Sequence, residues 1–258
     1  MNYTYKVEKC KLIKTIRRLA SIKGDRMKVI GLIGGMSWES TSMYYQIINR
    51  TIKENLGGLH SAKCILYSVD FAEIEACQSS GDWEKCAEIL SGAARSLERA
   101  GADCIVICTN TMHKIAKQVE MAVKIPLLHI ATLTAKVLLA ENICKVALLG
   151  TKYTMEQNFY KDKLIEKNIQ VLIPNDIDRE LVHRVIYDEL CLGSISEISR
   201  RKILKIIDKL AAAGAEGVIL GCTEIGLLVK QKDTSIKLFD TTQIHARNAA
   251  LYAIDMQK

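Results

Sequence analysis

The chain contains one pattern twice, as Ala100-Gly-Ala-Asp-Cys-Ile-Val-Ile-Cys-Thr109 and as Ala213-Gly-Ala-Glu-Gly-Val-Ile-Leu-Gly-Cys222, in the same register and without a gap. An apolar run that begins with lysine also occurs twice, at 28–32 and 145–149. Run and pattern are separated by 81 residues in the first half, from 28 to 109, and by 77 in the second, from 145 to 222. Chance seldom reproduces two segments at nearly equal spacing, so the sequence predicts two similar structural units.

Strand-like runs alternate with helical patterns through both units. Short apolar runs lie at 28–33, 63–69, 104–108, 127–130, 145–149, 170–173, 217–220 and 237–239. Amphipathic stretches typical of helices lie at 41–55, 83–100, 155–167, 178–190 and 196–213. This alternation predicts an α/β fold with mostly parallel sheets covered by helices.

Length and composition indicate a compact protein that does not bind nucleic acid. The chain has 258 residues, of which 49% are hydrophobic, enough for one large α/β domain or two small ones. The formal net charge is +7, but residues 1–26 hold eight Lys or Arg against two acidic residues, which is +6. The remaining +1 leaves the body from Met27 onward nearly neutral, which disfavours a phosphate-binding surface.

The basic N-terminal extension, residues 1–26, admits several interpretations. Met27 opens a segment that reads like the natural start of an α/β protein, so the extension could reflect an extended start site. The alternatives are an expressed basic tail or a weak helix on an acidic surface. The extension lacks the apolar core of a secretory signal, and no run approaches the roughly 18 apolar residues that span a membrane. We therefore expect a cytoplasmic protein without membrane association.

Nine cysteines raise the question of disulfides, metal binding or catalysis. They lie at positions 10, 64, 77, 86, 104, 108, 144, 191 and 222. No CxxC pair occurs, and several lie in apolar runs, where a reduced thiol packs as a small hydrophobic group. Cys104, Cys108 and His113 lack metal-ligand spacing. The sequence therefore predicts reduced cysteines and no metal site. Whether one of the thiols is catalytic depends on its position relative to the strands.

The repeat places Thr109 and Cys222 at equivalent positions, each just past the carboxyl end of a buried strand. Ligands of open α/β sheets bind at this end. If the two halves face one another, a hydroxyl and a thiol face each other across a cleft. Cys108 is the other thiol nearby, but successive strand side chains point to opposite faces, so it should face the core.

Cys222 lies in the segment Leu220-Gly221-Cys222-Thr223-Glu224, in which Gly221 allows a tight turn at the strand end. A helix that opens at Thr223 would lower the pKa of the thiol through its N–H groups and dipole. The alternative is a small buried residue that tolerates a crowded turn. Asn110 and Thr111 likewise follow the earlier strand and could aim polar groups at an anion or simply cap a helix.

The loop Gly34-Gly35-Met36-Ser37-Trp38-Glu39-Ser40-Thr41 follows the first strand. Paired glycines allow the backbone to approach a ligand closely, and Ser37 to Thr41 offer helix caps. The loop fits neither nucleotide-binding glycine motif, so we expect a small-molecule loop rather than a nucleotide site, with a plain turn as the alternative. Asp70, after the second strand, could serve the site or cap the next helix.

Three motifs together resemble the aspartate/glutamate racemase family. They are Gly34-Gly35-Met36-Ser37-Trp38-Glu39-Ser40-Thr41, Thr109-Asn110-Thr111 and Gly221-Cys222-Thr223-Glu224. The similarity runs from about Met27 to the C-terminus and is strongest to the bacterial branch of L-aspartate/glutamate-specific or broad-specificity amino-acid racemases. The resemblance implies a cofactor-independent isomerase of two pseudo-symmetric α/β domains with an active-site cleft between them. It assigns 27–124 with 236–258 to the first domain and 125–235 to the second.

A two-base mechanism follows for the cleft. Racemisation needs a base on one face of Cα and a proton donor on the other, because a single base returns the proton to the face it left. Cys222, as a thiolate, is expected to abstract the α-proton of the L substrate, and Thr109, or a water it orients, to supply a proton opposite. The expected substrate-binding residues are Asn110, Thr111, Thr223 and Glu224, together with Met36 and Gln78, which the resemblance places in the pocket. The resemblance also implies that Glu224 orients Cys222. The expected partner is a small amino acid, such as aspartate, glutamate or a relative, and a homodimer is compatible with the resemblance.

Two features depart from the family pattern. The family has cysteine immediately before Asn-Thr, where this chain has Thr109, so one direction of proton transfer should be handicapped. Many aspartate racemases also place an Arg after the second strand and a Lys in the second lobe, whereas this chain has no cation at 69–73 or 189–193. Two other functions stay open, namely a related cysteine enzyme that isomerises maleate or decarboxylates malonates, and an amino-acid-binding protein without turnover.

Overall fold

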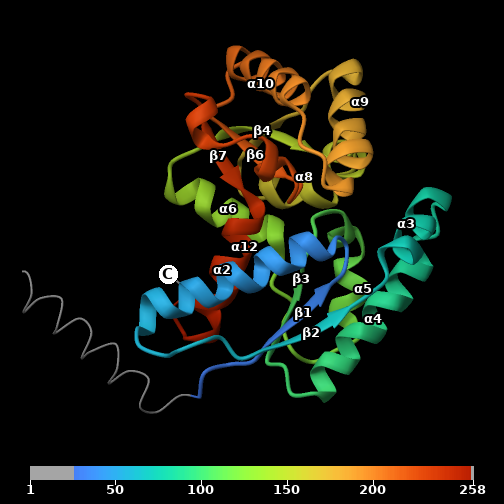
Figure 1. Ribbon diagram of the computed structural model, residues 1–258, viewed down its shortest axis with the longest axis vertical. Coiled ribbons are helices and arrows are strands. Elements are labelled where there is room, and N and C mark those ends of the chain that lie inside the picture. Colours follow the sequence, from blue (N-terminus) through green and yellow to red (C-terminus); the bar gives the residue numbers. More distant parts are fainter. Residues whose placement is uncertain (1–25, 257–258) are drawn as a thin grey trace, which may run out of the picture.

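The computed structural model describes residues 26–256, so the predicted N-terminal extension lies almost wholly outside the described residues. The described chain forms two parallel sheets, each within its own lobe (Figure 1). The first sheet contains, in spatial order, β2 (Cys64–Ser68), β1 (Ile30–Gly34) and β3 (Cys104–Ile107). The second contains β5 (Gln170–Leu172), β4 (Lys145–Gly150), β6 (Gly217–Gly221) and β7 (Lys237–Asp240). The predicted α/β class with parallel sheets is confirmed.

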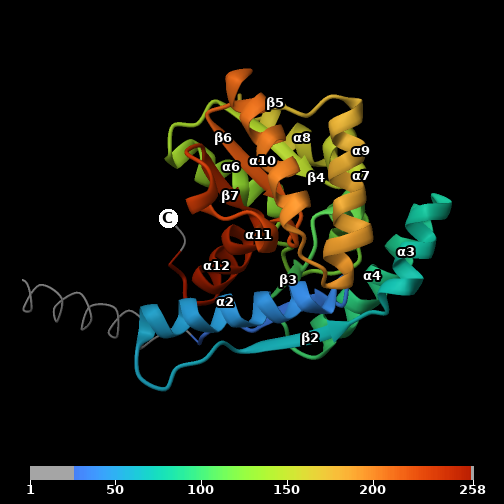
Figure 2. The same ribbon diagram turned by 45° about the horizontal axis from the view of Figure 1, so that its top comes forward.

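Helices cover both faces of each sheet. In the first lobe one face packs against α2 (Trp38–Leu56) and α12 (Thr241–Ala253), and the other against α4 (Trp83–Arg99) and α5 (Ala116–Met121). In the second lobe the layers are α9 (Asp176–Arg184) with α10 (Glu197–Ala212), and α6 (Ile130–Ala140) with α8 (Asn158–Ile165). A further helix, α3 (Phe71–Ser80), lies at the outer edge of the first lobe, beyond α4 (Figures 1 and 2). None of the described helices combines the length and apolar character needed to cross a membrane.

The sequence repeat corresponds to one structural unit made twice. In both copies the helix ends at a glycine with left-handed backbone, Gly101 at φ 94° and Gly214 at φ 92°, which a residue with a side chain rarely adopts. An acidic side chain two residues later accepts backbone N–H groups at the start of the neighbouring strand. Asp103 accepts from Val29, and Glu216 accepts from the N–H of Lys145. The repeat thus places a helix end, a buried strand and the residue that follows it identically in both lobes.

Strand pairing differs from the predicted division of the chain at two points. Leu127 forms a parallel bridge with Ile105 of the first sheet, and β7 pairs with β6 of the second sheet. The chain therefore crosses between sheets after Leu127 and returns with α12, which packs against α2 (Figure 1). The domain boundaries remain a prediction, which these pairings move to about 128 and 240.

Buried histidines hold the chain where it first crosses between the lobes. His245, on α12, donates from Nε2 to the carbonyl of Leu128 at 2.6 Å and accepts the hydroxyl proton of Tyr44 at Nδ1 over 2.8 Å. The neutral imidazole of His245 therefore uses both of its ring nitrogens in hydrogen bonds, one as donor and one as acceptor. His129 lies next in the chain and caps α6 by accepting the N–H of Ala131. Burial lowers the pKa of His129 to about 4 and that of His245 to about 3.

Acidification is expected to destabilise the fold through these histidines. In the unfolded chain they titrate near 6.5, so between pH 6.5 and about 4 the unfolded state binds more protons than the folded state, and stability is lost as the pH falls. Each histidine contributes up to about 1.4 kcal/mol per pH unit in this window. Urea unfolding at several pH values between 7.5 and 5 measures the slope. His245→Gln should have a shallower slope, whereas the matched change at exposed His60 should keep that of the native chain, and equal slopes in all three proteins would contradict the assignment.

Candidate active site

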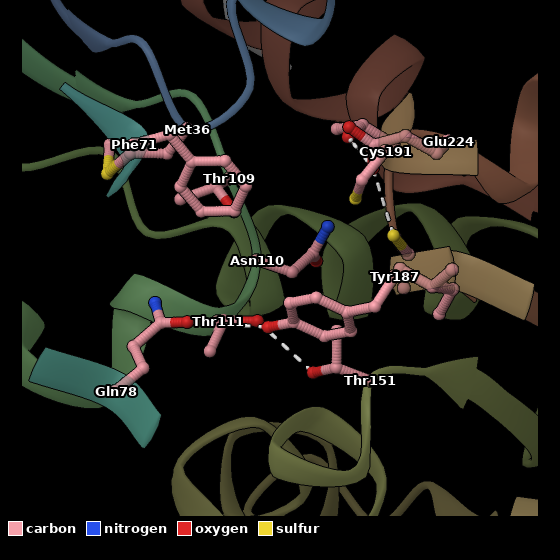
Figure 3. A pocket seen from close by; sticks show the side chains of 14 residues that line it. Met36, Phe71, Gln78, Thr109, Asn110, Thr111, Thr151, Tyr187, Cys191 and Glu224 are labelled. Atoms are coloured by element: carbon pink, nitrogen blue, oxygen red, sulfur yellow. Dashed lines mark hydrogen bonds between the residues drawn. The ribbon is translucent and has the colours of Figure 1, made fainter. Parts of the chain in front are cut away.

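Side chains from both lobes line one cavity at the carboxyl ends of β1, β3, β4 and β6 (Figure 3). The space among them that no atom fills is about 420 Å³, part of which is open solvent at the mouth. The lining consists of Met36, Phe71, Gln78, Thr109, Asn110, Thr111, Thr151, Ile186, Tyr187, Cys191, Gly221, Cys222, Thr223 and Glu224. All eight residues expected at the site from the sequence are among them.

Thr109 and Cys222 contribute to this cavity from opposite lobes, at the ends of β3 and β6. Figure 3 shows Thr109 on the wall of the first lobe with Met36, while Glu224, the neighbour of Cys222, lies on the facing wall. Cys108 is fully buried in the core between the first sheet and α2. The hydroxyl and the thiol therefore line one space, and the alternation along β3 keeps the second thiol out of it.

The Cys222 thiol is buried, and its electrostatic setting differs from the expectation. Burial, followed by the negative charge of Glu224, raises the pKa of Cys222 well above its usual range. A hydrogen bond from the backbone N–H of Glu224 acts in the opposite direction but is the smaller effect. The helix that follows, α11 (Ile225–Leu228), has only four residues and begins three positions later. The predicted lowering of the pKa by a helix start is wrong, and the resting group is a thiol.

Glu224 is a buried carboxylate that gathers donors from both lobes. It accepts from the Cys222 thiol at 3.0 Å and from the Thr223 hydroxyl at the same oxygen, Oε2. Its other oxygen accepts from the hydroxyl of Ser37 at 2.9 Å, which comes from the loop after β1 in the first lobe. Ser37 also caps α2 by accepting the N–H of Ser40. The expected contact between Glu224 and Cys222 is present, and the link across the lobes through Ser37 was not foreseen.

The Asn110 amide has a defined orientation. Thr241 donates its hydroxyl proton to the carbonyl of Leu220 at 2.8 Å, so its oxygen can only accept from Asn110. The Asn110 amide nitrogen fills this place at 3.0 Å. The carbonyl oxygen Oδ1 is left buried without a partner, although a buried polar atom normally has one. The cavity thus offers an acceptor at Asn110, which fits an N–H donor of a ligand rather than the anion expected from the sequence.

Three threonine hydroxyls form a chain that ends in the cavity. Thr111 Oγ1 lies 3.2 Å from Thr151 Oγ1, and Thr151 Oγ1 lies 3.2 Å from Thr154 Oγ1 (Figure 3 shows the first of these contacts). Three hydroxyl protons serve two contacts, so one proton remains, and donation from Thr154 towards Thr111 leaves it at Thr111. In that arrangement Thr111 is the hydroxyl that can donate to a ligand anion, and Thr151 supports it by donating to its oxygen. Thr223 differs, because its hydroxyl donates to Glu224.

Comparison with known proteins decides the family. The sequence profile described as Asp/Glu/Hydantoin racemase matches residues 33–249. The chain belongs to this family. The match covers both lobes and every residue that lines the cavity.

Solved structures and a curated relative support the same assignment. A Yersinia pestis protein assigned to the Asp/Glu racemases is 59% identical, with 88% of this chain and 99% of that chain covered and a TM-score of 0.83. An aspartate racemase homologue from Pyrococcus horikoshii OT3 is 38% identical at the same coverage, with a TM-score of 0.77. The broad specificity amino-acid racemase RacX of Bacillus subtilis (strain 168) is 23% identical over 224 residues, 85% of this chain and 96% of that protein. The chain is an amino-acid racemase.

The racemase cavity also contains residues that sequence reasoning missed. They are Phe71, Thr151, Ile186, Tyr187 and Cys191. Thr151 directly follows β4, the strand that the sequence repeat aligns with β1. Since the loop after β1 was expected at the site, the same alignment would have indicated Thr151. Ile186 and Tyr187 lie in a π-helical turn at 185–189, within the helix predicted at 178–190, and Cys191 lies in the short helix that follows. Their pattern carries no chemical signal, and only the fold brings them to the cavity.

The two glycines of the loop after β1 are required by the packing of the racemase backbone. A Cβ atom on Gly35 would lie 2.1 Å from the carbonyl oxygen of Val69, so the glycine permits contact between two backbone segments. Gly34 is similarly crowded by Thr41. The loop reaches the cavity through Met36, and close approach of the glycine backbone to a ligand remains a prediction. Asp70 caps α3 by accepting the N–H of Ala72, which is the second of the two roles expected for it.

Proposed function

We propose that this racemase inverts α-amino acids by proton transfer across the cavity, with Cys222 acting on one face of Cα and Thr109 on the other. One observation carries the proposal. A thiol and a hydroxyl from equivalent ends of repeated strands line the same small cavity. Racemisation requires acid–base groups on opposite faces, and duplication of one unit supplies that geometry directly.

The Cys222 thiol must lose its proton before it acts as a base. Glu224 already accepts a hydrogen bond from the thiol, so transfer along that bond gives a thiolate and a neutral carboxyl group. The thiolate then removes the α-proton of the L substrate and becomes a thiol again. Thr109, or a water that its hydroxyl orients, delivers a proton to the opposite face. Exchange with solvent then returns a proton to that oxygen and removes the proton that Glu224 accepted. Ser37 and Thr223, which donate to Glu224, hold its carboxylate in place for this exchange.

The remaining polar groups fit the two substituents that all α-amino acids share. The unpartnered oxygen of Asn110 suits the ammonium group, and the positive charge of that group offsets the buried charge of Glu224. The hydroxyl of Thr111, to which Thr151 donates, suits the α-carboxylate, where charge concentrates as the proton leaves. Each well-aimed donor of this kind is worth about 2.7 to 4 kcal/mol in a site that excludes water.

Exchange of the α-proton with solvent tests the proposal. In D2O, the enzyme is expected to wash deuterium into Cα of a substrate while optical rotation is lost at a comparable rate. Loss of rotation without exchange would contradict proton transfer through solvent-exchangeable groups. The absence of both, across a panel of L-amino acids, would contradict the function itself.

Thr109→Cys is expected to change the two directions unequally. A thiol is a much better base than a hydroxyl, so kcat for the D enantiomer should rise about tenfold more than kcat for the L enantiomer. Progress curves from each pure enantiomer measure both values. Thr109→Ser keeps the hydroxyl and serves as the matched control. An unchanged ratio in Thr109→Cys would count against placing Thr109 opposite Cys222.

A further inference from the structure

We propose that the substrate of this racemase has an uncharged side chain, so that the amides glutamine and asparagine are preferred to glutamate and aspartate. The inference rests on the proposed function and names the substrate class for the same cavity. It comes from the charges that surround the bound molecule.

The described residues that line the cavity include no Lys, Arg or His. The ionisable carboxylate among them is Glu224, which is 6% exposed and accepts only from hydroxyl and thiol groups in its own side-chain contacts. The cavity therefore provides negative charge and neutral dipoles. A zwitterionic amino acid with a neutral side chain enters it without adding net charge.

Two lysines that neighbour lining residues in sequence have other partners. Lys152, next to Thr151, forms an ion pair with Glu180 at 2.7 Å. Lys114, three residues after Thr111, lies over the ring of Trp83, with Nζ 3.6 Å from the ring centre. Neither lysine is among the residues that line the cavity.

A side-chain carboxylate would thus be a second anion beside Glu224 without a counterion. The substrate ammonium can offset one negative charge, and the α-carboxylate already occupies the neutral donor at Thr111. An additional buried anion loses its hydration and is repelled by the charges present, which is costly unless a cation pairs with it. Amide and carboxylate side chains have nearly the same shape, so charge decides between them.

The lining residues that are left to contact the substrate's side chain carry no charge. Phe71 and Ile186 supply apolar surface, and Tyr187 donates its hydroxyl to Gln78 Oε1 at 3.4 Å. The Gln78 amide nitrogen is bonded to Met112 Sδ at 2.9 Å, and a thioether is a weak acceptor. Gln78 therefore keeps an N–H able to turn to a better acceptor, such as an amide carbonyl. Figure 3 shows Gln78 and Tyr187 reaching towards each other from the two lobes.

Matched pairs of substrates test the inference on the native enzyme. Deuterium exchange at Cα is followed by proton NMR for L-glutamine against L-glutamate and for L-asparagine against L-aspartate, with L-methionine as an uncharged substrate without an amide. The uncharged members are expected to have kcat/KM values at least about 100-fold higher than their acidic partners. An acidic member that exchanges as fast as its amide, or faster, overturns the inference.

A cation placed in the cavity should reverse the preference. Cys191→Lys adds an ammonium group at the lining, and the ratio of amide to acid is expected to fall at least about tenfold. Leu192→Lys is the matched control, since it adds the same charge at the next residue, whose side chain is 77% exposed, and it should leave the ratio unchanged. If the ratio of amide to acid fell equally in both variants, the preference would not depend on charge inside the cavity, and the inference would be overturned.

The two proposals fail in different ways. If no amino acid exchanges its α-proton, the proposed function is wrong, and the substrate inference falls with it. If exchange occurs but favours the acids, proton transfer stands and the uncharged substrate class alone is wrong. Preference for the amides, lost on Cys191→Lys, supports both.

Discussion

Cys222→Ser is expected to lower the rate of α-proton exchange by at least about 10³-fold, because a serine hydroxyl is a far weaker acid and base than a thiol. The substitution preserves size and the contact with Glu224, so folding and substrate binding should persist. Exchange into D2O should be measured for each enantiomer, together with binding of the substrate by calorimetry. Loss of exchange with retained binding assigns the effect to chemistry.

Two matched changes sharpen this result. Cys144→Ser removes an exposed thiol and should leave the rate unaltered. Cys191→Ser removes the second thiol of the cavity, whose pKa burial raises to about 12. If Cys191→Ser abolished exchange while Cys222→Ser did not, the base would be Cys191, and the assignment to Cys222 would be wrong.

Gly35→Ala is expected to destabilise the first lobe strongly. The backbone of Gly35 has φ 95°, and an added Cβ would lie 2.1 Å from the oxygen and 2.8 Å from the nitrogen of Val69. Both contacts are to backbone atoms, so relief requires β1 and the segment after β2 to separate. Left-handed strain and steric overlap together should cost at least about 3 kcal/mol, or a decrease in Tm of about 6 °C or more.

Gly81→Ala provides the control for Gly35→Ala. Gly81 ends α3 with φ 77°, and no atom lies within 4 Å of the position that an added Cβ would occupy. Its substitution therefore introduces only the left-handed strain, about 1 kcal/mol. Thermal unfolding of both variants separates strain from overlap. Similar decreases in Tm would show that the overlap at Gly35 is relieved cheaply.

The α/β class and the central pair of site residues could be predicted because the repeat encodes both. A helix end, a buried strand and the next residue form one local unit, and local units leave their pattern in the sequence. Once two such units are aligned, Thr109 and Cys222 occupy equivalent strand ends. The loop containing Met36 and the residue Gln78 followed from the family resemblance.

Other parts of the site depend on contacts between distant segments. Tyr187 lies in a π-helical turn that continues α9, and Cys191 lies in the short helix after it, where both line a cavity shared with the other lobe. The raised pKa of Cys222 depends on burial by both lobes and on the adjacent Glu224. The free oxygen of Asn110 depends on Thr241, which lies 131 positions away in the chain. None of these leaves a short-range pattern.

The unequal pair at the repeated strand ends has a consequence for the product. D and L enantiomers have identical free energies in water, so the equilibrium mixture is racemic whatever groups catalyse the reaction. The Haldane relation therefore requires equal kcat/KM in the two directions, even though one direction begins at sulfur and the other at oxygen. If kcat is lower for the D enantiomer, KM for the D enantiomer must then be lower in the same proportion. The chemical asymmetry of the duplicated halves therefore appears only in the substrate concentrations at which the enzyme saturates with each enantiomer.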